Sequence, residues 1–320
     1  MRISEKLADL FEKQACYVPP NALSRQVPLC SLCTMRVGGK AAYVVCPPDL
    51  ESFCRLLCAV REAQIPYLIL GAGSNVIAGD SDFEGVVFST KKLQKIAIEG
   101  TKIKAECGFL LNRLILLAAK RDLCCMERLY GIPGTVGGAV KMNAGAHGTN
   151  IADWLVCATL FSPVNGGRRV FTKEELAFSY RDSLLQHCRD LVVLDATFQA
   201  LPKERRFIKQ SIEQIVRLRL HAQPIGLPSA GSVFRRPPEG EAVWRLIERC
   251  GLRGHTVGGA QISPKHAGFI VNCGNASAKD VCSLVGLSYT QVLSTCGVSL
   301  VPEVEFFHLS EEEKCHLPIL

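Results

Sequence analysis

The 320-residue sequence lacks long apolar runs, blocks of basic residues and a concentration of aromatic side chains. No apolar run approaches the ~18 residues of a membrane span, and residues 1–14 show no apolar core of a secretory signal. The net charge of +7 is spread along the chain, and the 7% of aromatic residues are not interleaved with basic ones. Such a pattern argues against nucleic-acid binding. We expect a cytoplasmic protein without a membrane partner that is a monomer or a weak oligomer.

The chain also lacks the second cysteine pair that a zinc site requires. Sixteen cysteines are present, but only Cys30 and Cys33 form a CxxC motif, and no partner pair follows at a suitable spacing. The others lie in apolar contexts, where a reduced thiol packs as a small hydrophobic side chain. We predict no metal site.

The length predicts two or three domains, and the pattern of elements indicates an α+β fold. Helical spacing marks residues 50–64, 110–123, 203–220, 244–254 and 277–297. Strands are expected over 41–49, 66–70, 85–90, 190–200, 267–274 and 298–307, with hairpins over 95–108 and 154–172. The predicted domains are 1–70, 71–203 and 204–320, and the last strand could pack back on the earlier domains.

Two glycine-rich loops carry the first functional signal. They are "GAGSN" at 71–75 and "GIPGTVGGAVKMNAG" at 131–145. Glycine lets backbone N–H groups approach phosphate oxygens without a Cβ in the way. Two such loops fit a ligand with two phosphates. The alternative is a pair of tight structural turns, and the Rossmann fingerprint is incomplete after "GAGSNV".

Six motifs in order resemble one family. They are "TMRVGGKA", "LGAGSN", "GIPGTVGGAVKMNAGAHG", "SYRDS", "PSAGSVFRRP" and "PEVEF". The chain resembles the UDP-N-acetylenolpyruvoylglucosamine reductases, flavoenzymes of peptidoglycan synthesis, from about Thr34 to Phe306. The resemblance implies a three-domain flavoenzyme, in which two subdomains of the vanillyl-alcohol-oxidase type hold FAD and a C-terminal domain binds the nucleotide sugar.

The resemblance also implies a reaction in two halves. NADPH reduces the flavin, and hydride then passes to C3 of the enolpyruvyl ether while C2 gains a proton. Arg181 and Glu303 match the residues that act on the substrate carboxylate, and Ser232 matches the proton donor. Burial would raise the pKa of Glu303 and so favour its protonated form. Each residue has an ordinary alternative: a surface ion pair of Arg181 with Asp182, a turn cap at Ser232, or a polar strand position for Glu303, with Glu305 competing for its role.

By the same resemblance, both loops bind FAD without a covalent bond. The cofactor candidates are Gly71, Ala72, Gly73, Ser74, Asn75, Gly131, Pro133, Gly134, Thr135, Gly138, Ala139, Asn143 and Gly145. The candidate contacts of the nucleotide sugar are Tyr180, Arg219, Gln223, Arg235, Lys265 and His266. The alternative for the cationic residues among these substrate candidates is that they form a basic face exposed to solvent.

Three departures from the family pattern stand out: Lys141 before "MNAG", Ala222 in place of a residue that is often basic before "QP", and Trp244, which could fill core or narrow the substrate site. Only 51 positions separate Arg181 from Ser232, a spacing that resembles the compact branch of the family, without a long substrate-covering loop.

Two other functions remain open from the sequence alone. One is an oxidase on the same fold that tethers its flavin through His147, since fold does not fix chemistry. The other is a flavin- or nucleotide-sugar-binding protein without catalysis.

Overall fold

The computed structural model describes residues 9–13 and 18–317, and the chain divides into two compact units. Unit 1 contains the chain up to Arg25, Tyr43–Ala72 and Glu84–Leu218. Unit 2 contains Gln26–Ala42, Gly73–Phe83 and the chain from Arg219 onward. This division does not test the three predicted domains, which stay a prediction. Near the N-terminus, residues 9–13 are helical.

A four-stranded sheet with the order β1-β2-β5-β3 contributes most of its residues to unit 1. Its strands are β1 (Leu23–Pro28), β2 (Lys40–Val45), β3 (Tyr67–Leu70) and β5 (Phe83–Ser89). The parallel pair β3–β5 is connected to β2 through α2 (Leu50–Glu62). Asp49 starts α2 by accepting from the backbone N–H of Ser52 at 2.8 Å, as N-cap residues do. Phe53 of α2 packs edge-on against Phe88 with ring centroids 5.8 Å apart.

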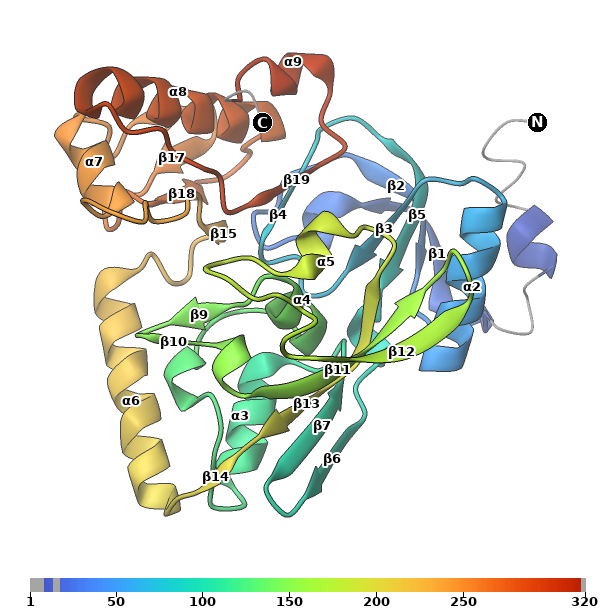
Figure 1. Cartoon of the computed structure of the whole chain (residues 1–320). Helices are drawn as coiled ribbons and strands as arrows, with labels where there is room; N and C mark the ends of the chain where they lie inside the picture. Colours follow the sequence, from blue (N-terminus) through green and yellow to red (C-terminus); the bar gives the residue numbers. More distant parts are fainter. Residues whose placement is uncertain (1–8, 14–17, 318–320) are drawn as a thin grey trace. The chain divides into compact units, whose positions relative to one another are not determined.

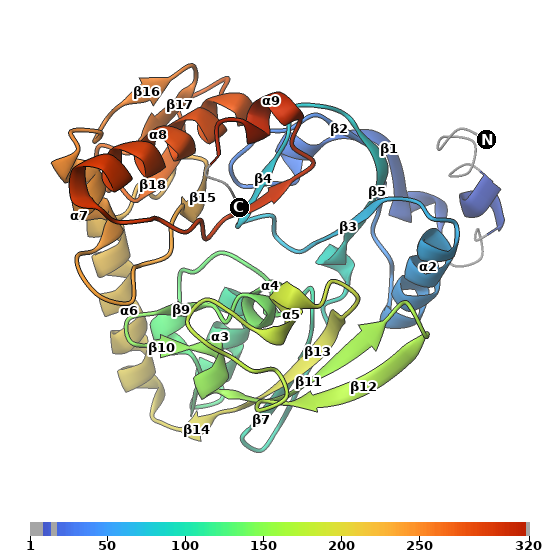
Figure 2. The same ribbon diagram turned by 45° about the horizontal axis from the view of Figure 1, so that its top comes forward.

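The second sheet of unit 1 is antiparallel and has the order β12-β11-β13-β7-β6. Its strands are β6 (Ile96–Glu99), β7 (Lys102–Glu106), β11 (Leu155–Ser162), β12 (Gly167–Thr172) and β13 (Val192–Gln199). Both predicted hairpins are confirmed: β6–β7 turns at Gly100, which has φ +55°, and β11–β12 pairs Ser162 with Gly167. In Figure 2, α3 (Leu111–Ala119) and α4 (Val136–Lys141) lie on one side of this sheet.

The remaining elements of unit 1 are mostly short, and the last of them is a long helix that continues into unit 2 from Arg219 onward. They are α3 (Leu111–Ala119), β8 (Leu123–Cys124), α4 (Val136–Lys141), β9 (Gly145–Ala146), β10 (Thr149–Asn150), α5 (Leu184–His187), β14 (Leu201–Pro202) and α6 (Arg205–Ala222). Single 3₁₀ turns occur at Pro20–Ala22, Leu29–Ser31, Thr90–Lys92, Glu127–Leu129 and Ile151–Asp153.

Unit 2 is built on a four-stranded antiparallel sheet with the order β15-β18-β17-β16. Its strands are β15 (Ser229–Ser232), β16 (Thr256–Val257), β17 (Ala260–Ile262) and β18 (Phe269–Asn272), and its helices are α7 (Val243–Arg249), α8 (Ala278–Cys296) and α9 (Glu311–Lys314). Figure 1 shows α8 running across this sheet. A capping box of Ser277 and Asp280 begins α8, and Gly297 ends it at φ +68°, as glycine does at left-handed helix ends.

Two early segments join unit 2 because their apolar side chains complete its core. Met35, Val37 and Ile77 are at most 2% exposed and belong to the same buried cluster as Leu284 and Val285 of α8. Ile77 lies in β4 (Val76–Ala78), which pairs in parallel with β19 (Glu305–Phe307). The segment that carries Glu303 is therefore held by β4, the strand that directly follows the first glycine loop.

The strand expected over 298–307 is shorter in the structure. Only Glu305–Phe307 forms a strand, and residue 302 makes an isolated bridge to Phe234. Pro302 has no N–H to donate to a ladder, and the chain around it changes partners, since Arg235 N–H donates to Val301 O at 2.8 Å and Glu305 N–H to Asn75 O at 2.8 Å.

Several thiols, such as Cys54, Cys107 and Cys282, are buried as the sequence predicts, but the prediction is wrong for Cys273 and Cys315, which are exposed. Burial raises the pKa of the Cys54 thiol to about 11 and that of the Cys282 thiol to about 12, so both stay protonated at neutral pH. Among the helices that the structure describes, none has both the length and the apolar composition that crossing a membrane requires.

Glu313 is a buried carboxylate whose removal tests the packing of unit 2. It is 3% exposed and accepts from the N–H groups of Asp80 at 2.8 Å and Ser310 at 2.6 Å. Burial acts to raise the pKa of Glu313, but these N–H donors outweigh burial and hold it below the usual value. Its contribution to stability is therefore present above pH ~4.5 and is lost as the pH falls through the lowered folded-state pKa.

We predict that Glu313→Ala lowers the free energy of unfolding by about 1–3 kcal/mol at neutral pH. Urea unfolding monitored by circular dichroism measures this change. The control is Glu311→Ala, whose side chain is 88% exposed in its pair with Lys314 and should change stability by less than about 1 kcal/mol. Equal effects of the two variants would contradict the assignment.

Candidate functional site

The two glycine loops meet within unit 1 at Gly71 and Thr135. A Cβ on Gly71 would lie 2.5 Å from Thr135 Oγ1, closer than nonbonded atoms approach. Thr135 is 2% exposed and caps α4 by accepting from Gly138 N–H at 3.5 Å. Gly71 is therefore favoured at this position because the Thr135 side chain occupies the space that a Cβ would fill.

Part of the glycine content of the second loop serves packing against β7 and the residues that follow it. Val136 N–H donates to Phe109 O and Gly137 N–H to Cys107 O, both at 2.8 Å. A Cβ on Gly137 would lie 2.9 Å from Cys107 Cβ. Gly138, by contrast, is exposed, and a Cβ there would have only Thr135 Oγ1 within 4 Å, at 3.8 Å. Of these two glycines, Gly138 is the one that leaves room for a ligand.

The start of the same loop is pinned by α3. Gly131 N–H donates to Asn112 Oδ1 at 2.8 Å, and Asn112 Nδ2 donates to Ile132 O at 3.2 Å. Gly134, at φ +153°, accepts from Leu111 N–H at 3.1 Å. These bonds leave Pro133 exposed at the tip of the loop. Ala139, in contrast, is 5% exposed inside α4.

The first loop is divided between the units. Ala72 is the last residue of its segment in unit 1, and Gly73 begins the next segment of unit 2. Gly73 has φ +64°, and a Cβ there would lie 2.3 Å from Leu32 O, so close packing within unit 2 accounts for this glycine. Asn75 Nδ2 donates to Glu303 O at 3.0 Å. Ser74 lies between Gly73 and Asn75 in the loop.

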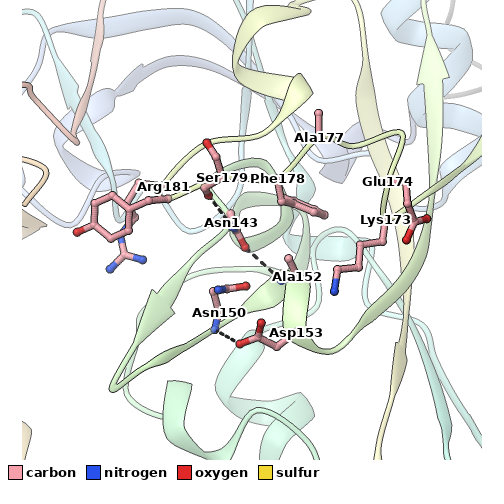
Figure 3. A pocket seen from close by; sticks show the side chains of 11 residues that line it. Asn143, Asn150, Ala152, Asp153, Lys173, Glu174, Ala177, Phe178, Ser179 and Arg181 are labelled. Carbon is pink, nitrogen blue, oxygen red and sulfur yellow. Dashed lines mark hydrogen bonds between the residues drawn. The ribbon is translucent and has the colours of Figure 1, made fainter. Parts of the chain in front are cut away.

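Arg181 lines a cavity of about 540 Å³ within unit 1. Figure 3 shows it at the opposite end of the cavity from Lys173 and Glu174. Its Nη2 donates to Gly145 O at 2.5 Å, and its guanidinium lies 5.2 Å from the ring centroid of Tyr180, which is 55% exposed. The neighbouring Asp182 contacts His187 Nε2 at 2.9 Å.

Ser232 and Glu303 come together within unit 2. Glu303 N–H donates to Val233 O at 2.7 Å, so the two candidate residues belong to adjoining backbone segments. Ser232, half-buried at the end of β15, donates from Oγ to Phe234 O at a long 3.4 Å. A Cβ on Gly268 would lie 3.5 Å from this Oγ. The hydroxyl is thus weakly bonded and lies beside a position without a side chain.

Arg219 shows an unsatisfied buried group. Its Nε is buried and has no hydrogen-bond partner among the described residues, and burial lowers the pKa of Arg219. A buried donor without a partner is costly, and an anionic ligand would satisfy it. Gln223 continues the chain one turn later, with its N–H donating to Arg219 O at 2.8 Å.

Three other predicted substrate contacts, Lys265, His266 and Arg235, have partners within unit 2. Lys265 Nζ donates to Leu220 O at 2.6 Å. The half-buried His266 accepts from Gly268 N–H through Nδ1 at 3.1 Å and packs on Phe269 and Trp244 with centroids 5.0 and 5.9 Å away. Trp244 itself packs against the core of unit 2. Arg235 is partly buried and donates its backbone N–H to Val301 O.

Sequence reasoning missed two residues that brace the Ser232 strand. Thr34 Oγ1 donates to Ser229 O at 2.7 Å, and Asn272 Nδ2 donates to Met35 O at 3.1 Å. Thr34 is the first residue of the motif "TMRVGGKA", and that motif is the sequence signal that could have identified it. Within the ranges that the structure describes, no group of three or more His, Cys, Asp or Glu side chains could hold a metal ion.

Comparisons with known proteins point to one family. Residues 223–307 match the model of the UDP-N-acetylenolpyruvoylglucosamine reductase C-terminal domain, and residues 41–167 match that of an FAD binding domain. The chain is 38% identical to the UDP-N-acetylenolpyruvoylglucosamine reductase of Thermotoga sp. (strain RQ2), with 93% of each chain covered. It is 40% identical to that of Clostridium novyi (strain NT), with 94% of this chain and 95% of the relative covered.

A solved structure agrees with these matches. The crystal structure of UDP-N-acetylenolpyruvylglucosamine reductase from Thermus caldophilus superposes with a TM-score of 0.76 at 34% identity, covering 89% of this chain and 98% of that one. The predicted α+β class, with an FAD-binding region followed by a C-terminal domain of this family, is confirmed.

The residues present fit an FAD. The FAD-binding match contains both glycine loops, and the contact of Gly71 with Thr135 brings parts of the two loops together in unit 1. The open position of Gly138 and the exposed Pro133 leave the backbone of the second loop accessible. Of the other cofactor candidates, Asn143 and Gly145 make contacts to the segment around Arg181.

We predict that His266 is neutral at neutral pH. Burial lowers its pKa from the usual 6.5, so as the pH falls below about 6.5 the unfolded chain takes up a proton before the folded one, and stability decreases. Two-dimensional NMR of the imidazole, assigned by the signal missing in His266→Gln, should give a midpoint below 6.5. A midpoint above that value would contradict the buried environment.

Proposed function

Because the chain belongs to the UDP-N-acetylenolpyruvoylglucosamine reductase family, we propose that it reduces UDP-N-acetylglucosamine enolpyruvate to UDP-N-acetylmuramate with NADPH as reductant, as a step in peptidoglycan synthesis. The observation that carries this proposal is the 2.7 Å bond from Glu303 N–H to Val233 O. It joins the two segments that hold the proposed proton donor and the proposed carboxylate partner, and an oxidase needs neither.

When bound, FAD takes up hydride from NADPH and supplies it to C3 of the enolpyruvyl group. The residues of the first loop (71–75) and residues 131–139 of the second are proposed to hold it. Their assigned members are Gly71, Ala72, Gly73, Ser74, Asn75, Gly131, Pro133, Gly134, Thr135, Gly138 and Ala139. Asn143 and Gly145 lie at the end of the second loop.

Ser232 is proposed to protonate C2. Hydride addition at C3 pushes electron density through C2 into the carboxylate, so C2 becomes basic enough to take a proton from a hydroxyl. The weak 3.4 Å bond of Ser232 Oγ to Phe234 O supports this role, since the donor loses little when it turns to the substrate. A positioned acid contributes about 10²–10⁴ in rate.

Arg181 and Glu303 are proposed to stabilise the charge that develops on the carboxylate. A guanidinium offers a planar fork of N–H donors that matches two carboxylate oxygens. Preorganised donors of this kind are usually the largest catalytic contribution. A protonated Glu303 would add a neutral donor to the same group.

The nucleotide diphosphate requires cations, and Arg219 is a proposed contact. Its buried Nε has no partner among the described side chains and backbone groups, which an anionic ligand would provide. Gln223, Arg235 and Tyr180 are further proposed contacts. Lys265 and His266 are weaker proposals, because their side chains already have hydrogen-bond partners within unit 2.

We predict that Ser232→Ala separates the two halves of the reaction. NADPH should bleach the flavin at the wild-type rate, whereas reoxidation by the enolpyruvyl sugar should slow about 10²- to 10⁴-fold. Anaerobic stopped-flow absorbance measures both steps. Ser229→Ala, in the same strand, is the control and should retain both rates. Slowing of both half-reactions by Ser232→Ala would contradict its role as the proton donor.

We predict that Arg219→Ala weakens binding of UDP about 10- to 100-fold, because a hydrogen bond to a charged group is worth about 1.5–3 kcal/mol. Isothermal titration calorimetry measures the dissociation constant. Arg217→Ala removes an exposed arginine of the same helix and serves as the control. If both variants weaken UDP binding equally, the effect comes from the general positive charge of the helix, and the assignment of Arg219 is wrong.

A further inference from the structure

We infer that Asn143 and Gly145 are positioning residues for Arg181, which set the place of its guanidinium through one buried side chain and one position without a side chain. This inference rests on the proposed function, because it concerns the same reaction. It goes beyond the cofactor role expected for the second loop, since it assigns the end of that loop to the Arg181 segment.

The backbone around Arg181 needs support from its surroundings. Residues 179–182 form a tight turn in which Ser179 N–H donates to Asp182 O at 3.1 Å and Asp182 N–H to Ser179 O at 3.3 Å. Arg181 sits in it at φ +55°. Residues other than glycine occupy this left-handed region at a cost, and the conformation persists only where neighbouring contacts impose it.

Asn143 supplies the main buried contact to this turn. It is 4% exposed, and its amide is used at both ends: Nδ2 donates to Ser179 O at 2.7 Å, and Oδ1 accepts from Ala152 N–H at 3.1 Å. Figure 3 shows Asn143 between these two partners. Asparagine also tolerates the residue's own φ of +41°. The side chain thus ties the turn to the 3₁₀ turn at 151–153.

Two further bonds hold the segment just after the turn. Gln186 Nε2 donates to Arg181 O at 2.7 Å, and Ser183 Oγ donates to Lys141 O at 2.6 Å. The backbone of Arg181 is therefore fixed on both sides. What remains to be set is the direction of its long side chain.

Gly145 sets that direction. Its carbonyl accepts from Arg181 Nη2 at 2.5 Å. A Cβ on Gly145 would lie 2.7 Å from Arg181 Nη1 and 2.9 Å from Thr149 O. Gly145 is not among the residues with positive φ, so its own backbone conformation suits alanine, and the Thr149 carbonyl would have to shift slightly. The atom most able to move is the end of the arginine side chain, and an added methyl group would displace the guanidinium.

Misplacing the guanidinium should harm one half of the reaction. The proposed role of Arg181 is to stabilise charge on the substrate carboxylate, and that charge develops only while the enolpyruvyl sugar is reduced. Reduction of the flavin by NADPH does not involve it. A shift of about 1 Å in a catalytic group can cost about 10²-fold in rate.

The test begins with Gly145→Ala. Reoxidation of reduced enzyme by the enolpyruvyl sugar should slow about 10- to 100-fold, while bound FAD per protein and the rate of bleaching by NADPH stay at wild-type values. The control is Gly148→Ala in the same hairpin. Unlike Gly145, Gly148 has a positive φ, +79°, and open space around its missing Cβ, so backbone strain without displacement of Arg181 should leave the reoxidation rate unchanged.

A double-mutant cycle distinguishes positioning from general damage. In an Arg181→Ala background, Gly145→Ala should cause no further loss, because its effect runs through the missing guanidinium. Asn143→Asp, which keeps the acceptor for Ala152 N–H and loses the donor to Ser179 O, should behave in the same way. Independent, multiplying losses for both residues, or loss of bound FAD in both, would overturn the inference.

A structural readout separates this inference from the proposed function. The Nε–Hε NMR signal of Arg181, assigned by its absence in Arg181→Lys, should shift in Gly145→Ala and stay in place in Gly148→Ala. An unmoved signal in Gly145→Ala would overturn the inference whatever the activity. If the sugar never reoxidises the reduced wild-type enzyme, the proposed function is refuted. The NMR signal of Arg181 then still tests whether Gly145 positions its guanidinium.

Discussion

The candidate cofactor site depends on the contact between Gly71 and Thr135. A side chain at residue 71 would collide with Thr135 Oγ1, since its Cβ would lie at 2.5 Å, and Thr135 in turn caps α4. Glycine here lets the backbone of the first loop approach the Thr135 side chain of the second. Close packing also explains Gly73 and Gly137, so much of the glycine content builds the framework and a smaller part is left for a ligand.

The residues proposed to act on the substrate carboxylate and on C2 are held in place by different elements in the two units. Arg181 is held in unit 1 by a left-handed turn, a buried asparagine and a carbonyl that receives the guanidinium. Ser232 and Glu303 are held in unit 2 by backbone bonds between adjoining segments, with Asn75 joining Glu303 to the loop before β4. The reaction proposed needs fixed donors at a developing carboxylate charge, and rigid backbone placement provides them with little reorganisation.

Local patterns predicted most of the elements, because their causes are local. The Gly100 turn between β6 and β7 and the start of α2 can be read from a few neighbouring residues. Long-range features could not be predicted in this way. The residues next to Met35 and Ile77 in the sequence do not indicate that these side chains complete the core of unit 2. The contact of Asn75 with Glu303 becomes visible only in the pairing of β4 with β19.

The strand predicted over 298–307 is too long because Pro302 interrupts it. The catalytic candidates came from whole motifs rather than from the chemistry of single residues, which left each with an ordinary alternative.

The most direct test is an anaerobic titration of the purified wild-type protein followed by its visible absorbance. The account predicts a bound flavin that NADPH bleaches and that regains its colour on addition of UDP-N-acetylglucosamine enolpyruvate, with UDP-N-acetylmuramate formed in equal amount. A protein without flavin, or a reduced flavin that the sugar does not reoxidise and that only oxygen restores, would contradict it.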